Sequence, residues 1–108
     1  TGYPLINQVK IAPEQEWVKR IWEMSERTLR LCMHETHEDC PYYEQLQYIL
    51  DTRLQMQFTY TLGGDTRMGR RTIFDFHASL LPDGILQSRY PCTMPRSSRA
   101  LPCNGSAC

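Results

Sequence analysis

The stretch from residue 42 to residue 61 constrains the fold most strongly, because its helical pattern is apolar on more than one side. Its apolar residues are Leu46, Ile49, Leu50, Leu54, Met56 and Phe58. A surface helix shows a single apolar stripe, whereas a helix that is apolar on several sides must be covered on several sides. Gly63 and Gly64 then give a helix stop of the expected kind. The sequence therefore predicts a helix with several neighbours.

Two further helices are predicted on either side of this one. Residues 13–33 open with a proline suited to a first turn, and their apolar residues recur at three- and four-residue steps: Trp17, Val18, Ile21, Trp22, Leu29 and Cys32. Residues 66–80 can be capped by Asp65 or Thr66 and place Met68, Ile73, Phe76 and Leu80 inward. We expect an all-α chain of about three helices, the first two packed antiparallel.

Three carboxylates lie where the second helix is expected to begin. Asp39 precedes Cys40 and Pro41, a pattern typical of a helix start, which places Glu44 in the first turn. Seven positions separate Glu44 from Asp51, so both acids are predicted to share one helix face. Tyr48 borders that face and is predicted to bind the substrate. A helix lined by acids, amides and tyrosines on one side is typical of a carbohydrate site.

The composition excludes several classes of function. The chain of 108 residues has a formal net charge of zero, which offers no attraction to nucleic acid or to an anionic membrane. No stretch approaches the roughly 18 apolar residues of a membrane span, and the first residues resemble no leader. We therefore expect neither a nucleic-acid nor a membrane partner, and the compartment stays open.

The cysteines and histidines invite a metal or thiol interpretation that their spacing does not favour. Five cysteines at irregular spacing predict free thiols rather than a disulfide framework. The run Cys32, His34, His37 and Cys40 matches no zinc module, so neither a metal nor a cofactor is predicted. Cys40 and His37 could act as a nucleophile and its base, but a cysteine before proline is more typical of a small buried residue. This loop is predicted to form the mouth of a pocket, with His37 near the ligand.

Two long motifs carry a resemblance to a known family. They read DCPYYEQLQYILDTRLQ and GDTRMGRRTIFDFHASLLPDGILQSRYP. In these residues the chain resembles the bacterial α-L-rhamnosidases of glycoside hydrolase family 78, over nearly all of residues 14–95. The resemblance implies a fragment of an (α/α)6 barrel, the six-hairpin glycosidase fold. It also implies an inverting hydrolase of terminal α-L-rhamnosides, with a rhamnose-containing oligosaccharide or glycoside as partner.

The resemblance also implies roles for individual residues. Glu44 takes the position of the general acid, and Asp39 and Asp51 take positions that hold sugar hydroxyls. Arg89 and Tyr90 fall on a loop expected to face the sugar. The family's general base is a glutamate on a later part of the barrel, well beyond Cys108. We therefore expect the isolated chain to be inactive.

The last residues do not fit the pattern of the rest. Residues 1–95 are predicted to be the N-terminal part of the catalytic domain, and residues 96–108 to be an out-of-frame, disordered tail. The family would continue Q-V-I-P-G-F-A-L-Q-W-I. If codons are chosen for this run and one base is deleted from the first, the new frame encodes every residue from Arg96 to Gly105. Reading the nucleotides tests this hypothesis, which an intact frame would reject.

Two other functions remain open at this point. A related six-hairpin glycosidase could act on a different sugar, since fold and acid placement do not fix the substrate. Alternatively, three amphipathic helices could form a non-catalytic interaction module. The acid-lined face is the feature that distinguishes an enzyme from such a module.

Overall fold

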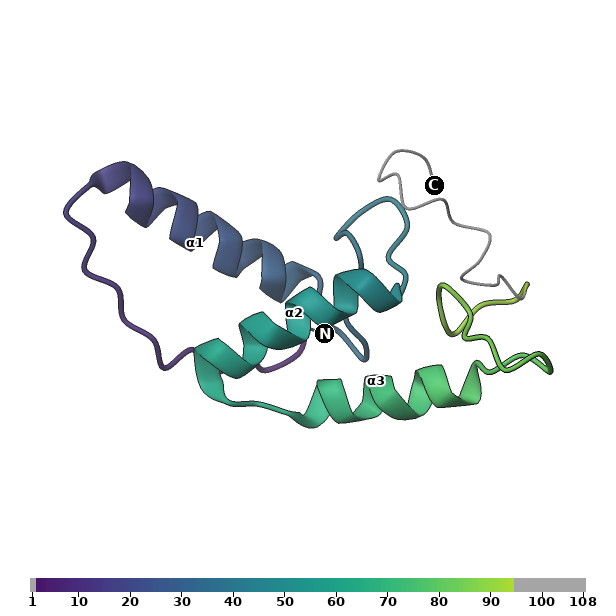
Figure 1. Cartoon of the computed structure of the whole chain (residues 1–108). Helices are drawn as coiled ribbons and strands as arrows, with labels where there is room; N and C mark the ends of the chain where they lie inside the picture. The colour runs from purple at the N-terminus through teal and green to yellow at the C-terminus, as the bar shows by residue number, and fades with distance from the viewer. Residues whose placement is uncertain (1, 95–108) are drawn as a thin grey trace.

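The computed structural model of this chain describes residues 2–94. Its fold class is all-α, with helices joined by irregular segments (Figure 1). The helices are α1 (Glu16–Leu31), α2 (Ile49–Gly63) and α3 (Arg67–Ala78). Within the described range the only β-type pairings are two isolated bridges, one between Met33 and His37 and one between Tyr48 and Arg89. The predicted all-α class and the first and third helices are confirmed, with ends within three residues of those expected.

Helices α2 and α3 form an antiparallel hairpin, in which α3 runs back alongside α2 (Figure 1). Gly64 ends α2 with a left-handed φ of 67°, and its N–H donates to the Tyr60 carbonyl at 3.0 Å. Glycine adopts this conformation without steric cost. Asp65 Oδ1 then accepts the Arg67 backbone N–H at 3.0 Å, which satisfies a free amide at the start of α3.

The core lies where the N-terminal segment meets the ends of the three helices. It consists of Leu5, Leu29, Met33, Leu62 and Met68. The N-terminal segment is held there by backbone hydrogen bonds from Tyr3 to Met33 and from Gln8 to Leu62. It passes so close to Gly63 that a Cβ on this glycine would collide with the Ile6 carbonyl oxygen. The segment before α1 is therefore an integral part of the fold.

The predicted helix over residues 42–61 is wrong at its N-terminal end. α2 begins only at Ile49, and residues 39–48 form an irregular loop, here called the acid loop. Gln45 has a φ of 52°, which a right-handed helix does not allow, and Tyr48 pairs instead with Arg89. Pairing with a distant segment outweighs the local helix signal.

Two packing predictions are also corrected. α2 packs against α3 rather than against α1, which meets the other helices mainly through Leu29 in the core. Ile73 on α3 and Leu80 just beyond it are exposed, whereas Met68 and Phe76 on α3 are buried as predicted.

None of the described helices combines the length and the apolar character that crossing a membrane requires. The proposed tail, residues 96–108, lies outside the described range.

Candidate functional site

The acid loop is closed by a pair of hydrogen bonds between its ends. The Asp39 N–H donates to the Leu46 carbonyl at 2.8 Å, and the Leu46 N–H donates to Asp39 Oδ1 at 2.9 Å. Within the loop, the Glu44 N–H donates to Cys40 Sγ at 3.3 Å. Asp39 thus caps a loop rather than a helix, and Glu44 is presented by that loop rather than by the first turn of α2.

Gln47 anchors the acid loop to the rest of the chain and is 2 % exposed. Its Nε2 donates to Asp75 Oδ2 at 3.2 Å and to the Tyr90 carbonyl at 2.9 Å, and its Oε1 accepts the Thr72 hydroxyl at 3.1 Å. The Tyr90 N–H also donates to the Gln47 carbonyl at 3.1 Å. The local sequence around Gln47 shows none of these distant partners.

Asp39 and Glu44 lie close enough to Asp51 to affect its titration. Asp51 stands in the first turn of α2, and its pKa is raised by partial burial and then by the negative charges of Asp39 and Glu44. The Asp51 residue is exposed to solvent, so the effect of burial on its pKa is limited. The three acids that the sequence placed on one helix are therefore brought together by a loop and a helix.

Tyr48 and Arg89 are joined by a hydrogen bond between their side chains. The Tyr48 hydroxyl accepts a hydrogen bond from Arg89 Nη1 at 3.3 Å, and Tyr48 is 9 % exposed. Burial raises the pKa of the Tyr48 phenol, and the neighbouring Glu44 carboxylate raises it further. Arg89 has a raised pKa, chiefly because of its hydrogen bond to Tyr48. The structure thus joins a phenol and a guanidinium from two distant segments, and the Glu44 charge acts on that phenol.

His37 occupies a different position from the other predicted site residues. It closes a tight turn after α1, and its side chain is fully buried. Burial lowers its pKa to about 4, and the nearby Gln55 amide offsets this slightly without making a well-formed hydrogen bond to either ring nitrogen. The ring is enclosed in the described structure, whereas the sequence pattern placed it at a pocket mouth.

Tyr90, the remaining predicted residue, is half-buried. In its two hydrogen bonds with Gln47, Tyr90 uses its own backbone N–H and carbonyl and not its side chain. In the described part of the chain, no group of three or more His, Cys, Asp and Glu side chains is arranged to hold a metal ion. Cys32, Cys40 and Cys92 are free thiols.

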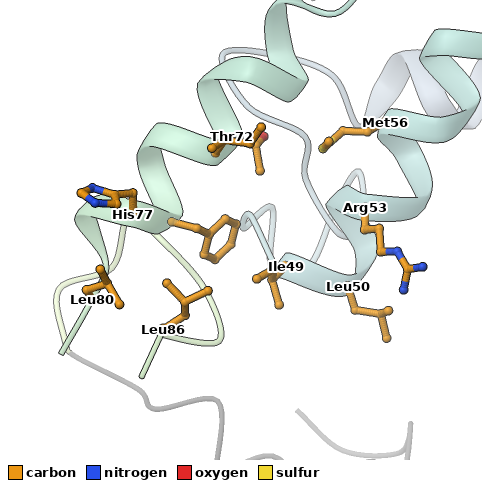
Figure 2. A pocket seen from close by; sticks show the side chains of 10 residues that line it. Ile49, Leu50, Arg53, Met56, Thr72, His77, Leu80 and Leu86 are labelled. Carbon is orange, nitrogen blue, oxygen red and sulfur yellow. The ribbon is translucent and has the colours of Figure 1, made fainter. Parts of the chain in front are cut away.

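An open hollow of about 630 Å³ lies elsewhere, between α2 and α3 (Figure 2). Figure 2 shows Ile49 and Met56 of α2 and Thr72 of α3 between the two helices, and the lining also includes Leu50 and His77. Its lining is predominantly apolar and includes none of the acids described above. A sugar requires polar partners, so the acid loop is the better candidate site.

Comparison with known proteins agrees with the six-hairpin glycosidase fold expected from the sequence. The family model of the bacterial alpha-L-rhamnosidase 6 hairpin glycosidase domain matches residues 8–105. No curated protein and no solved structure matches the chain. A six-hairpin domain needs more helices than α1, α2 and α3, so these form a fragment of such a domain. This chain belongs to the bacterial α-L-rhamnosidase six-hairpin glycosidase domain family.

Proposed function

We propose that the complete domain to which this chain contributes hydrolyses terminal α-L-rhamnosides by an inverting acid/base mechanism. Glu44 is the general acid, and Asp39 and Asp51 bind sugar hydroxyls. The observation that carries the proposal is the grouping of these three carboxylates around one loop, inside a glycosidase family domain. Arg89 and Tyr90 enter the proposal because the 88–90 segment is paired directly with the acid loop.

The chemistry assigns a different protonation state to each acid. Glu44 must donate a proton to the leaving oxygen, while Asp39 and Asp51 accept hydrogen bonds from hydroxyls as charged groups, which makes those bonds stronger than neutral ones. Inversion further requires an ionised base that activates water, roughly 6.5–9.5 Å from the acid. We assign this base to the remainder of the barrel, outside this chain.

The first experiment tests the substrate. The complete domain is assayed against a panel of nitrophenyl glycosides, and the anomer released first is identified by NMR. Hydrolysis of the α-L-rhamnoside with inversion is expected. Preferential hydrolysis of another sugar would support the alternative six-hairpin glycosidase, and no hydrolysis of any glycoside would favour the interaction module.

The second experiment tests the roles of the acids in the complete domain. Glu44→Gln should slow substrates with poor leaving groups far more than aryl glycosides with good ones, which need little proton donation. Asp39→Asn and Asp51→Asn should slow both kinds alike, because they weaken binding of the sugar itself. An equal effect of Glu44→Gln on both kinds would make Glu44 a binding residue.

A further inference from the structure

Two adjacent tyrosines in the middle of the acid loop, here called the tyrosine pair, are almost fully exposed. Tyr42 is 77 % exposed and Tyr43 is 89 % exposed, the two highest values among the large apolar and aromatic side chains of residues 2–94. Their rings meet edge to face, with centroids 5.1 Å apart and planes at 78°. Aromatic rings bury a large apolar area when they meet a partner, so a pair presented to solvent is characteristic of a binding surface.

Hydrogen bonds on both sides of the tyrosine pair fix the backbone that presents it. Gln45 Nε2 donates to the Pro41 carbonyl at 3.1 Å, and the Glu44 N–H donates to Cys40 Sγ at 3.3 Å. Both bonds span the pair, inside the two bonds that close the ends of the acid loop. The pair is therefore held in place before any ligand arrives, which lowers the entropy lost on binding.

The tyrosine pair directly precedes Glu44 in the acid loop. A general acid must come within hydrogen-bond reach of the glycosidic oxygen, which is the atom that joins the sugar to the leaving group. Side chains next to the acid on one short, closed loop therefore lie near the bond that is cleaved. The terminal sugar is already assigned to Asp39 and Asp51, so the leaving group is the part of the substrate left for the pair.

The chemistry of the tyrosine pair differs from that of the surfaces that a further layer of helices would cover. Those surfaces carry side chains such as Leu50 and Phe74, which have no polar atom. A phenol combines an apolar ring with a polar hydroxyl and suits a surface that stays in contact with water. A dry layer packed on the pair would also cover the neighbouring Glu44 carboxylate, and burying a charge without a partner is costly.

We propose that Tyr42 and Tyr43 form a subsite for the leaving group of the substrate, and that this subsite prefers a planar aromatic ring. Aromatic rings favour offset-stacked and edge-to-face contacts, and a pair at 78° offers a third ring one face and one edge. The place of the leaving group rests on the proposed function. The contact with a ring does not depend on which sugar the ring is attached to.

Kinetics of the complete domain test the subsite with two substrates that share the sugar, nitrophenyl and methyl α-L-rhamnoside. Tyr42→Ala and Tyr43→Ala should each raise KM for the nitrophenyl substrate by roughly 2- to 10-fold, the range of one aromatic contact, with kcat unchanged. KM for the methyl substrate should stay as it is. Tyr42→Phe and Tyr43→Phe keep the rings and should behave as the unaltered domain. Equal rises in KM for both substrates would overturn the subsite.

NMR tests the ring contact in this chain without any assay of activity. Tyrosine rings are labelled with ¹³C, and Tyr42→Phe and Tyr43→Phe identify the two signals. Millimolar nitrophenyl α-L-rhamnoside and nitrophenyl β-D-glucoside should both shift these signals, whereas methyl α-L-rhamnoside should not. The Tyr60 signal, from α2, is the internal control and should stay in place.

The remaining outcomes separate the subsite from the proposed function. Absence of shifts at the tyrosine pair, in a chain that circular dichroism shows to be helical, overturns the subsite. Shifts in this chain that are absent from the complete domain would show that another part of the domain covers the pair, and would overturn it as well. If nitrophenyl glycosides shift the pair in both proteins but the complete domain does not hydrolyse rhamnosides, the proposed function fails and the ring-binding surface stands.

Discussion

At the scale of single residues, Asp39 combines a structural and an electrostatic task. Its Oδ1 closes the acid loop by accepting the Leu46 N–H, and its charge helps to raise the pKa of Asp51. An asparagine keeps the accepting oxygen but removes the charge. The two tasks are therefore separable by a single substitution.

Asp39→Asn should lower the pKa of Asp51 toward its ordinary value without opening the loop. Burial, the largest cause of the upward shift, remains, so the return should be partial. The measurement is a ¹³C NMR titration of the aspartate side chains. Asp83→Asn is the control, because Asp83 is exposed and its Oδ1 also accepts a backbone N–H, from Ile85. An unchanged Asp51 titration in Asp39→Asn would show that the two acids are not coupled.

His37 makes the stability of the fold depend on pH. Its pKa is about 4 in the folded chain against an ordinary 6.5, so between these values the unfolded chain binds a proton that the folded chain does not. The stability contributed by the neutral ring is complete above about pH 6.5 and is lost as the pH falls toward 4. The full loss is about 3 kcal/mol, at 1.36 kcal/mol per pKa unit.

Urea unfolding between pH 4 and 7 measures this loss. His37→Gln should flatten the pH dependence in that window, whatever it does to the absolute stability. His77→Gln, which replaces an exposed histidine of α3, should leave the slope as it is. Glu26 and Asp65 add to the loss only at the acidic end of this window, because their lowered pKa values let their contributions fall away below the ordinary values of 4.5 and 3.8. Equal slopes in His37→Gln and the unaltered chain would contradict the prediction.

At the scale of elements, two helical glycines allow close approaches of different kinds. A Cβ on Gly63 would strike the Ile6 carbonyl oxygen, which belongs to the backbone of the N-terminal segment. A Cβ on Gly69 would strike the end of the Tyr60 side chain, which can move by rotation. The same substitution therefore meets a rigid obstacle in one place and a flexible one in the other.

Gly63→Ala should destabilise the chain by about 1–3 kcal/mol, the usual cost of overpacking, while Gly69→Ala should cost less. Both changes favour the helix by up to about 1 kcal/mol, so their difference reports the obstacle. The free energy of unfolding in urea measures both. In Gly63→Ala, amide protection of residues 3–8 should fall as well. Equal stabilities would mean that the N-terminal segment shifts without cost.

The helix positions differ in how well the sequence predicts them. α1 and α3 follow local apolar periodicity, so the sequence predicts their positions within a few residues. It does not predict the start of α2, because the Asp-Cys-Pro signal is used for a loop that is held by Gln47 and residues 88–90. The partners of Gln47 lie 25 to 43 positions away from it. Local patterns carry no information about such pairings.

The positions of the acids show the same limit. The sequence pattern predicts that Glu44 and Asp51 share one helix face, whereas in the structure Asp39 and Glu44 lie on the acid loop and Asp51 lies on α2. The burial of His37 escapes the sequence pattern for a similar reason. It depends on how the turn after α1 packs against Gln55 of α2, which is a tertiary contact.

At the scale of the whole molecule, the helices leave much apolar surface uncovered. Trp17 and Met24 on α1, Leu50 and Phe58 on α2, and Phe74 on α3 are all exposed. Together with the open hollow between α2 and α3, these side chains form the kind of surface that a domain buries against further layers. This agrees with a chain that supplies only part of a six-hairpin domain.

Because α1, α2 and α3 form only part of a six-hairpin domain, we expect this chain alone to have little or no hydrolase activity. It contains the proposed acid and the two proposed sugar-binding aspartates, but a proton donor without a base cannot activate the attacking water. Loss of one member of such a pair costs roughly 10²–10⁴ in rate, and loss of the facing wall removes substrate binding as well. The purified chain and the complete domain are compared on an aryl α-L-rhamnoside at equal concentration, with circular dichroism to show that the chain is helical. Turnover by the helical chain at a rate near that of the complete domain would contradict the prediction and require a base among Asp39, Asp51 and their neighbours.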